Sequence, residues 1–379
     1  MITNLLPAIL FAGPPHSGKS VLAYLLSRRL READVPHILL RAAPDGEGDW
    51  SYECPEEARV HQRQKGLYTA DLIADLLTAI RNRSLPMLVD IGGRLRAEQF
   101  ELLDACTHVV HLWREEADRQ EWTTWLEERS LIPIARLRSQ LAPPDELAPD
   151  AGPLQGTITG LDRNRPQPGP TFEHLFERVR GICAYPPVAL EAEHLRRAPA
   201  AIPLVTTAEL ARGLGIISPS GDIRWQPEHL PRLQELVPAS RPLAVYGRGP
   251  VWLYAALAAH VAPASFHLFD ARFYGWMEPP SVILGSDRAN CEFTLTALSE
   301  PDGLRLRFNR SDERYVLRPL PVHVPPLPAG RRIILDGAMP AWLWAALAAG
   351  LRHRPALAAY EPRTGRIVTF WRDGQLAAA

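Results

Sequence analysis

One stretch of the chain occurs twice, and this repeat constrains the fold more than any other feature. Residues 250–259 and 340–349 lie ninety positions apart, and eight of their ten residues are identical. Each copy follows a short apolar run, at 243–246 and 332–335, and then a glycine turn. This order predicts a strand, a turn and a helix whose first turn holds the proline. The sequence therefore predicts two related strand-turn-helix units, which we name copy one and copy two and which can form a pseudo-twofold pair.

The repeated unit has two interpretations. A helix that begins at a glycine turn points its free N–H groups outward, where a phosphate or carboxylate can bind. The same unit is also a common packing scaffold without a ligand. Three tryptophans in the repeat also have two interpretations, because they either stack on bases or belong to the core. They are Trp252, Trp342 and Trp344.

The N-terminal region carries a second strong pattern. An apolar run at 5–12, typical of a buried strand, leads into G-x-x-x-x-G-K-S at 13–20 and an amphipathic helix at 21–30. This is the context of a phosphate-binding P-loop. Lys19 is then expected to reach the β/γ oxygens of ATP and Ser20 to hold Mg²⁺. Because Lys19 and Lys65 are the only lysines, the choice of lysine here favours that role. The predicted nucleotide-binding residues are Gly13, Ser17, Gly18, Lys19, Ser20 and Asp90.

Further strands and helices alternate along this region, which predicts a doubly wound parallel sheet. Asp90, near the end of the third strand, is either a metal partner for Mg²⁺ or a helix cap. The acidic loop 44–50 is either a water- or metal-positioning loop or a solvated turn. Segment 139–170 is predicted to be a surface excursion or linker. The predicted strands are 37–41, 86–93, 107–113, 132–137 and 159–164, and the predicted helices are 69–81 and 171–179.

This order of elements resembles the P-loop class that includes dethiobiotin synthetase and the MinD-type ATPases, over residues 1 to about 180. The resemblance names no second substrate.

Composition excludes several classes of function. Lys+Arg 42 against Asp+Glu 43 gives a net charge of -1, which disfavours a duplex nucleic acid partner. The cysteines are far apart at 54, 106, 183 and 291, without disulfide or metal spacing, which is typical of a reducing compartment. No apolar stretch has membrane-spanning length. We therefore expect a cytoplasmic protein with no membrane partner.

A second correspondence follows the two repeated helices. Copy one continues with His260 and then Phe269-Asp-Ala-Arg272; copy two continues with Gly350 and then Tyr360-Glu-Pro-Arg363. An acid and an arginine two positions apart on a strand point to the same side. Such a pair either grips a phosphodiester or forms a structural ion pair.

The sequence Gly247-Arg248-Gly249-Pro250, the histidine after the helix and the aromatic-acid-x-Arg strand resemble a known family. They are similar to the small manganese-dependent ring nucleases of type III CRISPR systems, which cleave cyclic tetra-adenylate. The resemblance covers about 240–275 and 290–372. It implies an α/β chain with a P-loop NTPase-like domain at 1–185 and two ring-nuclease-like domains, at 186–288 and 289–379, forming a pseudodimer. It also implies Mn²⁺, a cyclic oligoadenylate ligand and a homo-oligomer.

Carried over by position, the resemblance implies catalytic residues, with Asp270 also a metal ligand. They are His260, Asp270, Arg272, Glu361 and Arg363. The implied substrate-binding residues are Gly247, Arg248, Gly249, Pro250 and Gly337. Each copy departs from the pattern where the other keeps it, so the hypothesis is either one composite site or one active copy beside a ligand-holding copy. Attack by the 2′-hydroxyl and attack by water both stay open.

Two other functions compete with a ring nuclease. The chain could be a sensor that binds cyclic oligoadenylate without cutting it and controls ATP turnover by the P-loop domain. Alternatively, it could be an ATP-dependent small-molecule kinase or ligase. Within the nuclease hypothesis, ATP has a regulatory role and is either hydrolysed or only bound.

Overall fold

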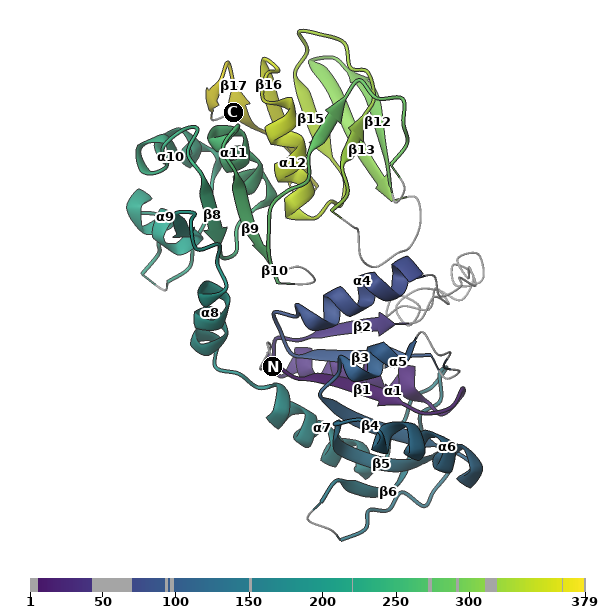
Figure 1. Ribbon diagram of the computed structural model, residues 1–379. Helices are drawn as coiled ribbons and strands as arrows, with labels where there is room; N and C mark the ends of the chain where they lie inside the picture. The colour runs from purple at the N-terminus through teal and green to yellow at the C-terminus, as the bar shows by residue number, and fades with distance from the viewer. Residues whose placement is uncertain are drawn as a thin grey trace. The chain divides into compact units, whose positions relative to one another are not determined.

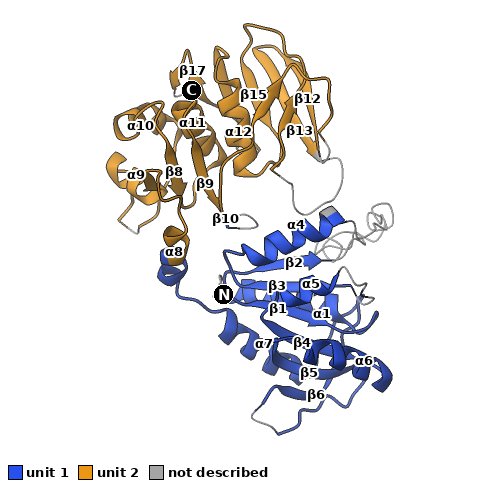
Figure 2. Cartoon of the chain, in the orientation of Figure 1, with its two compact units in different colours: residues 1–192, 271–274 blue, residues 193–270, 275–379 orange. Residues whose placement is uncertain are grey.

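The computed structural model describes residues 6–42, 70–92, 95, 99–149, 152–219, 221–271, 275–290, 293–310, 319–362 and 364–377. The chain divides into two compact units (Figure 2). Unit 1 comprises Met1–Ala192 with Ala271–Tyr274, and unit 2 comprises Glu193–Asp270 with Gly275–Ala379. Both copies of the repeat lie in unit 2, and the boundary expected between them stays a prediction. Within the described ranges, no helix is both long enough and apolar enough to cross a membrane.

Unit 1 is a parallel α/β sheet, as the sequence predicted. Its strand order is β2-β3-β1-β4-β5-β6, and every neighbouring pair is parallel. The strands are β1 Ala8–Ala12, β2 Ile38–Ala42, β3 Met87–Ile91, β4 His108–Trp113, β5 Ile132–Gln140 and β6 Leu154–Thr159. The helices are α1 Lys19–Glu32, α4 Ala70–Arg81, α5 Phe100–Asp104, α6 Glu116–Glu127 and α7 Pro170–Cys183.

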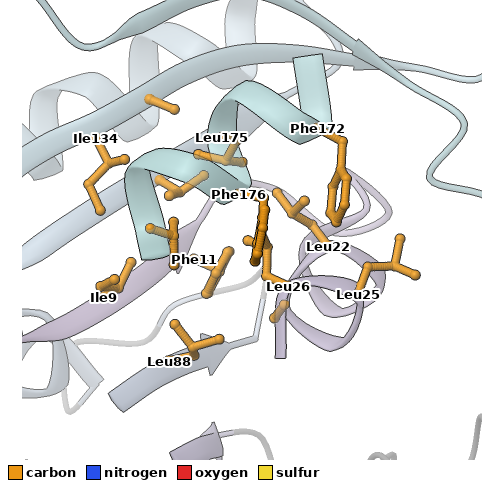
Figure 3. Close-up of a cluster of buried hydrophobic side chains, with 14 of the residues drawn as sticks. Ile9, Phe11, Leu22, Leu25, Leu26, Leu88, Ile134, Phe172, Leu175 and Phe176 are labelled. Atoms are coloured by element: carbon orange, nitrogen blue, oxygen red, sulfur yellow. The ribbon is translucent and has the colours of Figure 1, made fainter. Parts of the chain in front are cut away.

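Helices cover both faces of this sheet, so its central strands are apolar on both sides. All five residues of β1 are buried. On one face, Phe11 packs with Leu22 of α1 and Phe176 of α7 (Figure 3). On the other face, Leu10 belongs to a cluster with Ile80 of α4 and other side chains from α4, α5 and α6. This two-sided burial explains why the strands read as continuous apolar runs in the sequence.

The sixth strand corrects one prediction. The sequence placed it at 159–164 and treated 139–170 as an excursion, whereas β6 ends at Thr159 and pairs with β5. Asp145 holds this segment in place, because one carboxylate oxygen accepts from the Thr159 amide at 2.9 Å and the other from the Thr171 amide at 2.8 Å. The polar residues that suggested a linker therefore fasten the sheet edge to the start of α7.

The two larger sheets of unit 2 have matching centres. In one, β7, β8 and β9 are parallel and β10 is antiparallel; in the other, β13, β15 and β16 are parallel and β17 is antiparallel. The first sheet, which contains the strand of copy one, has β7 Leu204–Thr206, β8 Leu243–Tyr246, β9 Phe266–Asp270 and β10 Gly275–Met277. The second sheet, which contains the strand of copy two, has β12 Phe293–Glu300, β13 Gly303–Arg310, β15 Ile333–Asp336, β16 Ala356–Glu361, β17 Arg366–Arg372 and β18 Gln375–Leu376. From here on, copy one and copy two include these sheets.

Smaller elements complete the chain, with α8 running across the boundary between the units. A two-stranded sheet joins β11 Val282–Leu284 to β14 Val322–Val324. The helices are α8 Pro187–Arg196, α9 Thr207–Leu214, α10 Leu230–Leu236, α11 Val251–Val261 and α12 Ala341–Leu351, with a 3₁₀ turn at Pro227–His229.

The repeated helices α11 and α12 pack against each other (Figure 1). Each is apolar all round, which is the pattern of a helix buried on every side. The alanines of the two helices have little side-chain bulk, so the two backbones can approach closely. The three repeat tryptophans are buried, with exposed fractions of 3%, 2% and 2% for Trp252, Trp342 and Trp344. These tryptophans therefore belong to the core and do not have faces free for stacking on bases.

Candidate functional site

The loop 13–20 joins β1 to α1 in unit 1, and two of its glycines are required by the backbone. Gly13 has φ 141°, and a Cβ there would lie 1.9 Å from the carbonyl oxygen of Leu112. Gly18 has φ 87°, and a Cβ there would lie 3.0 Å from the side chain of Leu161. Both φ values belong to the region that favours glycine. The strand, loop and helix order expected from the sequence is present.

Lys19 is the first residue of α1 and folds back over the loop. Its Nζ donates to the carbonyl oxygens of Gly13 at 2.7 Å and Pro14 at 2.5 Å. The side chain is buried, and this desolvation lowers the pKa of Lys19 to about 8, although nearby Asp90 acts to raise it. The ammonium is thus held by neutral carbonyls in a poorly solvated place, where an anion of a ligand would stabilise its charge.

Asp90 lies on β3 beside the loop strand. It is buried, and its Oδ2 is 3.1 Å from Nη1 of Arg41 on the neighbouring strand β2. Among the described residues the next α-helix, α5, has Gln99 as its N-cap, so Asp90 does not cap that helix. The sequence assigned Mg²⁺ to the Ser20 hydroxyl, in the first turn of α1, and to the Asp90 carboxylate. Both are oxygen ligands of the kind that Mg²⁺ takes, and Arg41 already engages the carboxylate. The acidic loop 44–50 lies outside the described residues.

The glycine turns of the two copies have the same backbone geometry. Gly247 has φ 117° and Gly337 has φ 118°. A Cβ would lie 2.2 Å from Oγ1 of Thr207 at the first position and 2.7 Å from the carbonyl oxygen of Phe308 at the second. The sequence predicted the repeated prolines, at 250 and 340, in the first turn of each helix. In the structure each proline is instead the N-cap residue and has an extended backbone. In copy one Arg248 is exposed, and Gly249 and Pro250 are half-buried.

The strand pairing makes Asp270 and Glu361 equivalent. Val245 of β8 pairs with Leu268, and Leu335 of β15 pairs with Ala359, so each acid lies two residues beyond a matched pair. Both acids are half-buried at the ends of their strands. Glu361 accepts a hydrogen bond from the Thr364 hydroxyl at 3.2 Å. The two arginines of the motif, Arg272 and Arg363, lie outside the described residues.

Around Asp270, the strand ends of copy one carry an aromatic cluster. His194 Nδ1 is 2.9 Å from the Tyr246 hydroxyl, and the His194 ring lies 4.3 Å from the ring of Phe269. Trp276 Nε1 donates to the His194 carbonyl at 2.7 Å, and its ring lies 5.6 Å from that of Phe269. Tyr246, Phe269 and Trp276 are each half-buried, so they offer apolar faces at the sheet edge.

Around Glu361, the strand ends of copy two carry charges instead. Asp336, buried at the end of β15, lies 3.4 Å from Arg305 Nη1 and 3.9 Å from Arg307 Nε. Arg305 also contacts Glu300 at 2.7 Å and lies over the ring of Tyr360 at 4.7 Å. The side chain of Arg307 is 56% exposed, so its long contact with Asp336 leaves it accessible. The sequence interpretation missed both arginines, although their alternation with Leu304, Leu306 and Phe308 is a readable strand signal.

His260 is a core residue in this structure. It is 7% exposed, and its Nε2 is 2.8 Å from the carbonyl oxygen of Val237. At the matched position of copy two, a Cβ on Gly350 would lie 2.6 Å from Cβ of Val282 on β11. The difference between the copies therefore has a packing reason: a histidine fits where the turn at 237 passes, and glycine is needed where β11 crosses.

The predicted Mn²⁺ site does not fit the described side chains. Among them there is no group of three His, Cys, Asp or Glu residues that could hold a metal ion. Asp336, at the end of the strand next to that of Glu361, is already engaged by two arginines. We therefore derive no step of a reaction through a metal in unit 2.

A comparison with protein families gives an independent view of copy two. The model of the family described as CRISPR-associated protein (Cas_csx3) matches residues 316–375. The match indicates a CRISPR-associated protein. It spans β15, the Gly337 turn, α12, β16 and β17, so it includes Glu361 and Asp336 but not Asp270 or the loop 13–20. No curated protein matches the chain.

Proposed function

We propose that unit 2 binds a cyclic oligoadenylate, with cyclic tetra-adenylate as the first choice, and opens the ring by phosphodiester cleavage at copy two. The observation that carries the proposal is the coincidence of the family match with the charged strand ends of copy two. Copy one offers aromatic groups at the equivalent place. The proposal therefore develops the hypothesis of one active copy beside a ligand-holding copy.

A phosphate of the ring would bind at the turn before α12. The Gly337 turn and the N-terminus of that helix present backbone N–H groups, which favour an anion. Arg307 is exposed and only loosely held by Asp336, so its guanidinium can turn to a phosphate oxygen. Arg305, fixed between Glu300, Asp336 and the Tyr360 ring, keeps positive charge beside it. These groups stabilise the charge that develops on the phosphodiester during attack.

Glu361 is the residue we assign to proton transfer. Its carboxylate is half-buried at the end of β16 and accepts a hydrogen bond from the Thr364 hydroxyl at 3.2 Å. As general base it takes the proton of the attacking hydroxyl, either the ribose 2′-OH or water, while the phosphorus–oxygen bond to the leaving 5′-oxygen breaks and that oxygen gains a proton. The motif arginine, Arg363, would hold the same phosphate.

Copy one holds the other half of a symmetric ring in this proposal. Tyr246, Phe269 and Trp276 supply aromatic faces on which adenine stacks. The exposed Arg248 lies in the turn before α11, where it can contact the opposite phosphate. His260 supports the end of α11 through Val237 and touches no ligand.

Unit 1 has a regulatory role in the proposal. ATP with Mg²⁺ binds at the loop 13–20, where Lys19 contacts the β/γ oxygens and Ser20 and Asp90 hold the ion. The support is the geometry of the loop and its buried ammonium. ATP then shifts the population of the state that is competent in unit 2.

Product analysis tests the proposal. Labelled cyclic tetra-adenylate is incubated with the full chain, with Mn²⁺ or with a chelator, and with or without ATP. We expect linear products, and a loss of rate of about 100-fold or more in Glu361→Gln, the range for a general base. The matched variant Asp270→Asn, at the equivalent position of copy one, is expected to keep the rate within a few fold.

The other outcomes are equally specific. Loss of cleavage in Asp270→Asn but not in Glu361→Gln would move the active site to copy one. An intact ring that binds and changes ATP turnover would replace the nuclease by a sensor. A ring that neither binds nor opens, together with a phosphorylated small molecule as product, would leave the kinase or ligase.

A further inference from the structure

A cavity of about 220 Å³ lies in unit 1. It is bounded by residues of α6 and of strands β4 and β5. Apolar walls come from Val109, Leu126 and Pro133, and polar groups come from His111 and Arg136. None of the residues 13–20 lines it.

His111 lines this cavity and carries a buried polar atom without a partner in the described part of the chain. The side chain is 2% exposed, and its Nε2 is buried without a hydrogen-bond partner among the residues that the structure describes. Burial, together with the positive charges of Arg136, Arg119 and Lys19, lowers the pKa of His111 to about 4. The imidazole is therefore neutral at neutral pH. A buried nitrogen without a partner is unfavourable, which points to a group that is not part of the described chain.

Arg136 is the direct neighbour of His111 across the sheet. The two residues pair in the register of β4 and β5. Arg136 is half-buried, and within the described ranges no hydrogen bond or ion pair engages its guanidinium. The other arginine at the cavity, Arg129, is held by Asp104 at 3.0 Å. The one acid that lines the cavity, among the described residues, is the exposed Glu127.

These observations combine a cation without a partner, a neutral donor without a partner and apolar walls. Burying a charge in such a place is costly unless an opposite charge binds it. A guanidinium matches the two oxygens of a carboxylate or phosphate, and the neutral His111, as the Nε2–H tautomer, can donate a third hydrogen bond. The volume is below the 300–1,000 Å³ that is usual for sites of drug-sized ligands, so the ligand is small.

We propose that this cavity is a binding site for a small oxyanion with a compact apolar body. Arg136 holds the carboxylate or phosphate group, and His111 donates to one of its oxygens. Val109, Leu126 and Pro133 contact the apolar body. The site belongs to unit 1 and does not depend on the function proposed for unit 2.

Calorimetric titration of the full chain with benzoate tests the site, with benzamide as the neutral probe of the same shape. We expect benzoate to bind at millimolar concentrations and benzamide to bind at least tenfold more weakly, because hydrogen bonds to charged groups are the stronger ones. Arg136→Gln is expected to weaken benzoate by at least tenfold, and His111→Phe to weaken it less. The matched control is Arg138→Gln, which removes an exposed arginine two residues along the same strand, outside the cavity.

Each alternative result overturns the proposal. These results are no benzoate binding by the unchanged protein, equal binding of the two probes, or equal effects of Arg136→Gln and Arg138→Gln. Circular dichroism melting of each variant separates a lost site from a lost fold. If Arg136→Gln melts early, Arg136→Lys replaces it, since a lysine keeps the charge but not the two-pronged contact and is expected to bind benzoate with intermediate affinity. Binding of benzoate to Arg136→Lys as weak as that of benzamide to the unchanged protein would also count against the site.

Discussion

The affinity of the chain for ATP should depend on pH through one amine. Lys19 is buried and held by carbonyl oxygens, and its pKa is lowered from 10.5 to about 8. The β/γ phosphates would place negative charge beside it and restore the ordinary pKa or exceed it. In the proposed complex ATP would bind the protonated lysine, and binding would take up a proton wherever the free protein has lost it.

The size of the effect follows from the two pKa values. Below pH 8 the amine is protonated in both states, and affinity does not change. Above pH 8 the affinity falls roughly tenfold per pH unit, so we expect a loss of about 30-fold between pH 7 and pH 9.5. Stability moves in the opposite direction. A lysine with a lowered pKa in the folded state penalises folding below pH 8, and this penalty disappears as pH rises from 8 to 10.5. Weaker binding at high pH is then not a sign of unfolding.

Equilibrium titration with a fluorescent ATP analogue from pH 7 to pH 9.5 measures this slope. The chain offers a clean control, because Lys65 is its only other lysine. Lys65→Arg should keep the profile, and Lys19→Arg should flatten it, since a guanidinium does not titrate in this range. A flat profile in the unchanged protein, or the same slope in Lys19→Arg, would show that the reasoning about the buried ammonium is wrong.

Two further predictions concern the stability of unit 2. Gly247→Ala introduces a Cβ 2.2 Å from Oγ1 of Thr207 at φ 117°, so we expect a loss of about 1–3 kcal/mol in thermal unfolding. Gly181→Ala, on α7 of unit 1 with nothing within 4 Å of the added Cβ, is the control and should not lower stability. His260→Leu removes the partner of the buried Val237 carbonyl and should cost about 1–3 kcal/mol. It should leave the rate of ring opening per folded molecule unchanged, and a specific loss of rate would restore His260 as a catalytic residue.

Local patterns carried most of the fold that could be predicted from the sequence. The apolar run before Gly13 and the helix after it form one continuous signal, and the structure has both. The alanine-rich repeat likewise specified buried helices, because their composition leaves no polar face. The strand at 159–164 was misplaced because β6, at the sheet edge, carries Gly156 and several threonines and has a weak apolar pattern. Its position is decided by pairing with β5 and not by its own residues.

Residues that meet through non-local pairing were not predictable in the same way. Arg305 and Arg307 reach Asp336 only because β13 pairs in parallel with β15. His111 and Arg136 meet through the register of β4 and β5, which no spacing in the sequence reveals. His260 shows a different limit of prediction from sequence. A motif placed it at a site, but a motif does not report whether a side chain faces the core.

The packing of α11 against α12 also accounts for the close similarity of the two repeated helices. Each helix is buried on all sides, so a substitution in one helix alters its packing against the other helix and against the adjoining sheets. The two copies are nearly identical within the helices and differ at the strand tips, where Tyr246 of copy one corresponds to Asp336 of copy two. A truncated chain ending before β12 would also expose one side of α11 to water. The packing of copy one therefore depends on α12 of copy two.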